Sequence, residues 1–172
     1  MLGELGLTAR RIATKGPELQ SDDLGEIAIF AAREASTSCG RPLIVEDTGL
    51  FITSLGGFPG PYANYAYRTL GLEGILRMLR GSSNRDAKFE SVVAYCGPEG
   101  RPRLFRGSLL GRIGSRATGS SGFGFDPIFV PRGEERTLAE MTLARKCSLS
   151  HRAIATRKFG EWYLRSVPGQ RL

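Results

Sequence analysis

Residues 88–113 predict an antiparallel β-hairpin. Apolar and polar side chains alternate over 88–96, and this segment is rich in Phe, Val and Tyr, which favour strands. The turn sequence Gly-Pro-Glu-Gly follows at 97–100, and a second strand pattern covers about 103–113. Helix patterns precede and follow this hairpin, so the fold class depends on how strands and helices alternate along the chain.

The remaining patterns mix helices with short strands. A helix is expected from Leu24 to about Ser38, because Ser21, Asp22 and Asp23 supply a cap and early carboxylates that suit the helix dipole. The chain therefore predicts an α/β fold with a mixed sheet. The other expected elements are a buried strand at 42–45, a Gly- and Pro-rich loop at 55–61, helices at 62–70 and 72–80, a Gly- and Ser-rich loop at 114–124, a short strand at 127–130 and a C-terminal helix from its N-cap Ser150 to about 165.

The composition is that of a globular protein. With 172 residues, 41% of them hydrophobic and 24% charged, the chain suits a single compact domain spanning residues 1–172. No apolar run approaches the ~20 residues that cross a bilayer, and no apolar h-region follows a basic start, so we expect neither a membrane span nor a signal peptide. A cytoplasmic location is the default expectation.

The chain is basic, with a formal net charge of +7 at pH 7. Anionic partners are therefore expected, and both nucleotides and nucleic acids fit this charge. The charges are scattered, and no aromatic–basic interleaving suggests a platform for single strands, so we do not expect a nucleic-acid partner. Cys39, Cys96 and Cys147 are widely spaced and include no C-x-x-C pair, which predicts plain thiols rather than a disulfide framework or a zinc site.

The string Val-Glu-Asp-Thr-Gly at 45–49 is the first candidate site. Glu46 and Asp47 are expected to close the buried strand, at the end where α/β proteins usually bind ligands. Mg²⁺ is often held by one or two carboxylates together with substrate phosphates, and Glu26 in the preceding helix is a candidate third carboxylate. The alternatives are an Asp that caps the next turn and a Glu that only compensates the helix dipole.

Two further segments carry groups suited to a nucleotide. In Phe123-Gly124-Phe125-Asp126, an exposed Phe offers a face for stacking a base and Asp126 offers an acceptor, although two core aromatics flanking a turn are an equally open interpretation. Near the C-terminal helix, Lys146 and then Ser150-His151-Arg152 form a set of donors at a helix N-terminus. A surface cap is the alternative for that set.

Taken together and in this order, these segments resemble the inosine triphosphate pyrophosphatase family, also called Ham1-like or non-standard purine NTP pyrophosphatases. The strings that carry the resemblance are V-E-D-T-G, L-G-G-F-P-G-P-Y, F-G-F-D-P-I-F and K-x4-H-R, and it extends over essentially the whole chain. The resemblance implies an α/β domain with a curved mixed sheet, flanking helices and two lobes around an active-site cleft. It also implies a homodimer, with the Gly-Gly-Phe-Pro-Gly-Pro-Tyr segment through Tyr67 as a candidate interface.

The resemblance implies a role for each candidate residue. Asp47 is similar to the proposed general base or water-positioning residue, Glu26 and Glu46 to metal-site carboxylates, and the cofactor is Mg²⁺. The residues that resemble the substrate site are Thr48 and Gly49 beside the phosphates, Phe123, Gly124, Phe125 and Asp126 as the wall of the base, and Lys146, Ser150, His151 and Arg152 as the group that reads the purine.

The implied activity is hydrolysis of ITP, dITP and XTP to the monophosphate and pyrophosphate, which cleanses the nucleotide pool. A site lined by donors such as Arg152 favours a 6-oxygen over the 6-amino group of adenine. How guanine is rejected at its 2-position does not follow from the sequence. The alternative function is a catalytically impaired nucleotide-binding or interaction module of the same fold.

One motif of the family is not found in this sequence. Family members usually begin with a strand and a [ST]-x-N-x-x-K motif whose Asn and Lys hold the triphosphate, whereas this sequence begins at a point that resembles the end of the family's first helix. We therefore expect an N-terminally short domain. Three hypotheses remain: a longer natural chain, a short form in which arginines replace the lost contacts, and a form that has kept only binding.

Overall fold

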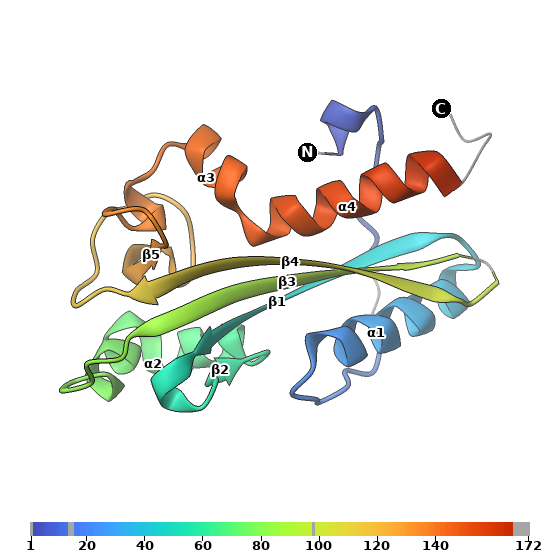
Figure 1. The fold of residues 1–172 in the computed structure, drawn as a ribbon. Coiled ribbons are helices and arrows are strands. Elements are labelled where there is room, and N and C mark those ends of the chain that lie inside the picture. The colour runs from blue at the N-terminus through green and yellow to red at the C-terminus, as the bar shows by residue number, and fades with distance from the viewer. Residues whose placement is uncertain (1, 14–15, 98, 167–172) are drawn as a thin grey trace. The chain divides into compact units, whose positions relative to one another are not determined.

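The computed structural model describes residues 2–13, 16–97 and 99–166 (Figure 1). The chain divides into two compact units. Unit 1 consists of Met1–Asp47, Ser91–Gly107 and His151–Leu172, and unit 2 consists of Thr48–Glu90 and Ser108–Ser150. The prediction of a single domain stays a prediction, because the chain shows two units of similar size.

The strands form one five-stranded sheet in the order β2-β1-β3-β4-β5. Strand β1 runs from unit 1 into unit 2, β3 runs back, and β4 returns to unit 2, so these neighbours are antiparallel. The two short strands also pair antiparallel, with Leu50 opposite Gly60 and Ile113 opposite Phe129. The α/β fold class is confirmed, but the sheet is antiparallel where we expected mixed directions. The strands are β1 (Leu43–Ile52), β2 (Pro59–Gly60), β3 (Asp86–Cys96), β4 (Pro102–Ile113) and β5 (Phe129–Pro131).

In unit 1, helices α1 (Leu24–Cys39) and α4 (His151–Ser166) lie on opposite faces of the strands (Figure 1). The α4 face is held by an aromatic cluster. Phe159 stacks on Tyr95 of β3 with ring centroids 5.9 Å apart, and Trp162 packs on Phe105 of β4 at 5.3 Å. Burying aromatic side chains of this size contributes most of the packing energy at such a contact, so this cluster holds the second half of α4 against β3 and β4.

The core of unit 2 packs α2 (Ala63–Met78) and the segment after β5 against the strands. Its fully buried side chains include Leu50, Ile75, Ile113 and Phe129. Within α2, Gly71 has non-helical angles of φ 64° and ψ −172°, which separates two helical halves and confirms the two helices expected on either side of it. The remaining helices are α3 (Leu143–Leu149) and the short 3-10 helices Gly3–Leu5, Thr53–Leu55, Asp126–Ile128 and Leu138–Glu140.

The hairpin expected over 88–113 is confirmed as β3 and β4, and the first predicted helix is confirmed as α1. The strand expected at 42–45 was too short, because β1 continues to Ile52. Its second half pairs with β2, which lies inside the segment expected to be a loop at 55–61. The sequence also missed α3, and the strand expected at 127–130 begins only at Phe129 after a 3-10 turn.

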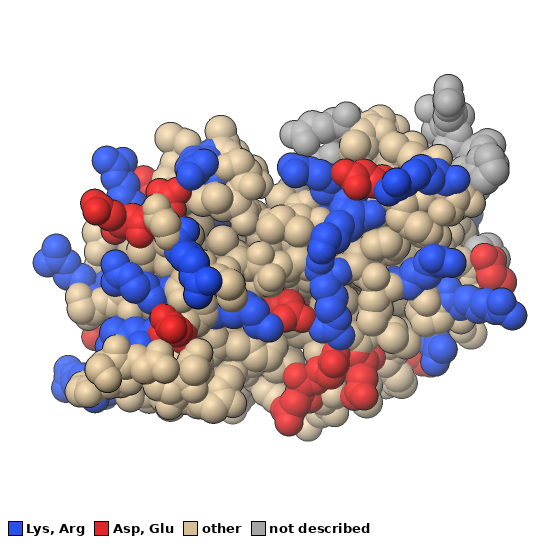
Figure 2. All heavy atoms as spheres, in the orientation of Figure 1, with Lys and Arg blue, Asp and Glu red and all other residues tan. Residues whose placement is uncertain are grey.

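The expectations about membrane spans, cysteines and charge distribution can be compared with the structure. No helix among the described residues is long and apolar enough to cross a membrane. All three cysteines are free thiols, as expected. Figure 2 shows Lys and Arg side chains spread over the face in view with Asp and Glu among them, which agrees with scattered charge.

Candidate active site

Glu46 and Asp47 lie in the middle of β1 rather than at its end, because the strand continues through Thr48 and Gly49. Successive strand residues point to opposite faces of a sheet. The Glu46 side chain lies on the α4 side, since it contacts Arg152 of that helix. Asp47 therefore points to the opposite face, the side on which α1 lies (Figure 1).

The Glu46 carboxylate receives two hydrogen bonds in unit 1. The hydroxyl of Ser91 on β3 donates to Oε1 over 2.6 Å, and Nε of Arg152 donates to the same oxygen over 3.1 Å. The Glu46 and Arg152 side chains are 34% and 35% exposed, so solvent screens this ion pair. The serine is fully buried. Two of the predicted site residues, Glu46 and Arg152, are thus brought into direct contact.

His151 begins α4 and is buried, so it lies under the surface beside Arg152. The backbone at this point is packed tightly against β4. A Cβ on Gly107 would stand 2.2 Å from the carbonyl oxygen of His151 and 2.6 Å from the amide nitrogen of Ala155. Only glycine allows this approach, and it brings the first turn of α4 down onto the sheet.

Glu26 lies in the first turn of α1 and is exposed. Its Oε2 accepts a hydrogen bond of 2.7 Å from the hydroxyl of Ser21. The N-cap of this helix is Asp23, whose carboxylate also accepts 2.8 Å from Nη2 of Arg106. That hydrogen bond, followed by the backbone bond from Gly25, lowers the pKa of Asp23 below its usual value.

The three predicted carboxylates do not gather into one cluster. Among the residues that the structure describes, no group of three or more His, Cys, Asp or Glu side chains is arranged to hold a metal ion. One or two carboxylate oxygens are nevertheless the donors that Mg²⁺ prefers, with water and phosphate oxygens completing its shell. In chemical type, the carboxylates of Glu26, Glu46 and Asp47 therefore suit a magnesium ion.

Unit 2 contains a second group of predicted residues, centred on Asp126. This carboxylate is 4% exposed, and its Oδ2 accepts from the amide of Phe123 over 2.7 Å and from Nζ of Lys146. Nζ of Lys146 also lies 4.6 Å from the centroid of the Phe123 ring. The ring itself is 62% exposed. The lysine and aspartate thus hold an aromatic face open to solvent, which is the geometry that stacking requires.

Glycines shape this loop. Gly122 has φ 84°, and a Cβ there would lie 2.2 Å from Oδ2 of Asp126. Gly124 is also left-handed, with φ 58°, which reverses the chain before Phe125. Phe125 is buried and meets Tyr67 edge-on at 5.4 Å, so its ring belongs to the core. Phe125 thus agrees with the core interpretation of this motif, and the stacking role expected of the exposed Phe123 stays a prediction.

The other predicted residues have local roles. A Cβ on Gly49 would stand 2.7 Å from the carbonyl oxygen of Gly60, so this glycine permits the close approach of β2. Thr48 is its partly buried neighbour. Ser150 stands between α3 and α4 and has the C-cap position of α3, where we expected only the N-cap of the final helix.

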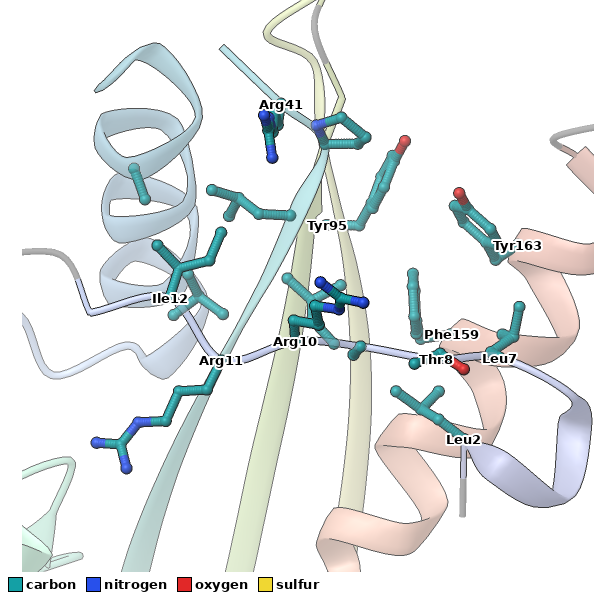
Figure 3. A pocket seen from close by; sticks show the side chains of 16 residues that line it. Leu2, Leu7, Thr8, Arg10, Arg11, Ile12, Arg41, Tyr95, Phe159 and Tyr163 are labelled. Atoms are coloured by element: carbon teal, nitrogen blue, oxygen red, sulfur yellow. The ribbon is translucent and has the colours of Figure 1, made fainter. Parts of the chain in front are cut away.

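A pocket of about 670 Å³ lies in unit 1 (Figure 3). The extended segment containing Leu7 and Arg10 crosses it, and Tyr95, Phe159 and Tyr163 line its other side. Burial, and then the neighbouring Tyr163, raise the pKa of Tyr95. None of the predicted site residues is among its described lining residues, so the pocket adds nothing to the predicted set.

Sequence reasoning missed three residues that build the site. Ser91 reads as an ordinary small strand residue, and only the fold shows that it meets Glu46. Gly107 interrupts a strand pattern, which is a signal of close backbone approach that we did not use. Gly122 is one of several glycines in its loop, and nothing in the sequence distinguishes it from the others.

Comparison with known proteins identifies relatives along the whole chain. The Ham1 family profile matches residues 3–162. A dITP/XTP pyrophosphatase of Methanopyrus kandleri is 51% identical over 170 residues, which are 99% of this chain and 90% of the relative. One from Thermococcus kodakarensis is 44% identical over 158 residues, covering 92% and 85% of the two chains.

A solved structure agrees with these relatives. The Ham1 protein of Staphylococcus aureus superposes with a TM-score of 0.81 at 28% identity, covering 88% of this chain and 81% of that one. The family profile, the sequence identity to these relatives and the similarity of the fold agree, and they show that the chain belongs to the Ham1 family.

Proposed function

We propose that this protein hydrolyses the non-standard purine nucleoside triphosphates dITP, ITP and XTP to the monophosphate and pyrophosphate, and so cleanses the cytoplasmic nucleotide pool. The observation that carries the proposal is its 51% identity, over 99% of the chain, to a relative named dITP/XTP pyrophosphatase. The residues that we propose for this chemistry include members of β1, of the loop before Asp126 and of the start of α4.

We assign Asp47 the role of orienting and deprotonating the attacking water. It lies within β1, a ten-residue strand hydrogen-bonded to β3, and a regular strand is a defined backbone position for a general base. Mg²⁺, when bound, neutralises charge on the phosphates and on the leaving pyrophosphate. Glu26 and Glu46 are the carboxylates proposed to hold it, and Thr48 and Gly49 are proposed to lie beside the phosphates.

We assign the base to Phe123 and Arg152. The exposed Phe123 ring offers a stacking face, which is worth about 1–3 kcal/mol per base. Its support from Lys146 and Asp126 keeps this face in place before the nucleotide arrives. Arg152, with Ser150 and His151 beside it, is proposed to donate to the 6-oxygen of hypoxanthine or xanthine.

Selection against adenine follows from this donor. Adenine presents an amino group at position 6, so the donor of Arg152 would lose its partner at a cost of about 1–3 kcal/mol. Guanine shares the 6-oxygen, and the described residues give no account of its rejection.

We further propose a homodimer through unit 2. Four aromatic side chains between Gly57 and Arg68 are substantially exposed, and Tyr65 is the most exposed of them at 62%. Apolar side chains exposed in such number often mark an interface. Sedimentation analysis of the wild type and of Tyr65→Lys tests this, since a monomeric wild type would refute it. The four side chains are Phe58, Tyr62, Tyr65 and Tyr67.

The test of function is pyrophosphate release from dITP, ITP, XTP, GTP and ATP with and without Mg²⁺. We expect Mg²⁺-dependent release from the first three, well above that from ATP. The alternative of an impaired binding module predicts nucleotide affinity without release, and the comparisons do not favour it. Binding without any release would therefore overturn the proposed activity.

A further inference from the structure

The hydrogen bonds around Glu46 join three elements of unit 1 in one chain of contacts. Ser91 of β3 donates to Oε1 of Glu46 on β1, and Arg152 of α4 donates to the same atom. Ser91 shares its face of the strand with Val93 and Tyr95, which pack against α4. The serine therefore lies underneath the point where the helix begins.

The Ser91 hydroxyl is used in an unusual way for a buried strand residue. Its side chain is fully buried, and its hydrogen bond of 2.6 Å falls in the range of a charge-assisted O–H···O⁻ contact. Buried hydroxyls more often bond to the backbone. Ser36, also buried in unit 1, does so, since it contacts the carbonyl oxygens of Arg41 and Gly97. The hydroxyl of Ser91 instead fixes an ionised side chain from beneath.

The bond from Arg152 comes from Nε, at the inner end of its guanidinium group. The five donors of arginine form a rigid planar fork, so fixing Nε sets the plane in which the outer Nη groups lie. An arginine that is ordered before the ligand arrives loses less conformational entropy on binding. The orientation of Glu46 therefore decides the orientation of Arg152.

We infer that Ser91 is a positioning residue for purine recognition, acting through Glu46 to hold Arg152 in the orientation that donates to the 6-oxygen. This inference rests on the proposed function, because it assumes that Arg152 reads the base. It gives Glu46 a second role beside the proposed metal site, and it places the determinant of base preference partly in a residue that the nucleotide never touches.

The experiment compares the affinity for ITP with that for purine riboside triphosphate, which has hydrogen in place of the 6-oxygen. Calorimetry with Ca²⁺ in place of Mg²⁺ measures binding rather than turnover. The ratio of the two dissociation constants measures the contacts at position 6 and at the adjacent N1, which is a donor in hypoxanthine and an acceptor in purine. In Ser91→Ala we expect the preference for ITP to fall about tenfold, while the affinity for the analogue stays within about twofold.

Three variants make the result specific. Ser91→Thr keeps the hydroxyl and should therefore keep the preference for ITP. If that variant does not fold, Glu46→Gln still tests the inference, because it should lose the preference as Ser91→Ala does. Ser36→Ala removes a matched buried hydroxyl outside the chain of contacts and should leave the preference unchanged. In an Arg152→Ala background, Ser91→Ala should cause no further loss, because the two residues act as one unit.

Equal losses of affinity for both nucleotides in Ser91→Ala would overturn the inference, since a structural defect acts on both. So would a wild type that binds the two nucleotides equally. Hydrolysis is measured separately on the same samples. A preference that follows this pattern without any pyrophosphate release would refute the proposed function and leave the inference standing.

Discussion

In unit 2, Asp126 and Lys146 form an ion pair in which the two side chains are buried to different extents. The Asp126 side chain is 6% exposed and the Lys146 side chain is 17% exposed. Removing one partner of a buried pair is strongly destabilising, because the remaining charge loses its compensation. Lys146→Met leaves the more deeply buried charge, so we expect it to lower the free energy of unfolding by about 3 kcal/mol, against about 2 kcal/mol for Asp126→Asn.

The double variant tests whether the two charges act together. Replacing both charges leaves no unpaired ion, so we expect a loss of only about 2 kcal/mol where independent effects would sum to about 5 kcal/mol. Urea unfolding followed by circular dichroism and by the fluorescence of Trp162 supplies the measurement, provided that the two transitions coincide.

Arg145→Met is the matched control for this pair. Arg145 precedes Lys146 and pairs with Glu134, but its side chain is 56% exposed. Exposed pairs contribute about 0.2–1 kcal/mol, so this variant should lose less than either of the others. A buried, coupled pair is excluded if Lys146→Met lowers the free energy of unfolding no more than Arg145→Met, or if the losses of the two single variants add in the double variant.

Three further predictions concern separate sites. Gly107→Ala places a Cβ 2.2 Å from the backbone of α4 and should cost about 2–4 kcal/mol in urea unfolding, whereas Gly16→Ala has open space and should cost less than about 0.5 kcal/mol; equal costs would contradict the packing described. The lowered pKa of Asp23 means that its contribution is present above pH 3.8 and is lost as the pH falls through the folded-state pKa, so Arg106→Ala should weaken the acid dependence of unfolding below pH 3.8; an unchanged profile would contradict it. Phe123→Ala should weaken ITP binding by about 1–3 kcal/mol in calorimetry without lowering the melting temperature, because the ring is 62% exposed; unchanged affinity would exclude stacking on it.

The sequence predicted the elements with strong periodic patterns. The hairpin at 88–113 and the helix from Leu24 agree with β3, β4 and α1, because alternation and capping are local signals. The helix break at Gly71 was also expected. The length of β1 was not predicted, because its second half is stabilised by pairing with β2, a contact that the segment's own composition does not indicate.

In the candidate site, too, local features could be predicted from the sequence and contacts between distant segments could not. The residue types of the motifs were recognised from their order, but their partners were not. Nothing in the sequence joins Glu46 to Ser91, which lies 45 positions later, or places Asp126 against Lys146. Phe123 and Phe125 can also be told apart only in the folded chain, since they have the same residue type and differ in burial.

We propose that the chain cleaves between the α- and β-phosphates of its substrate by means of Asp47. The most direct measurement is the product ratio from dITP in Mg²⁺, determined by ion-exchange chromatography for the wild type and for Asp47→Asn. We expect dIMP and pyrophosphate in equal amounts from the wild type, and neither product from Asp47→Asn although it still binds dITP. Release of dIDP and phosphate, or undiminished activity in Asp47→Asn, would contradict it.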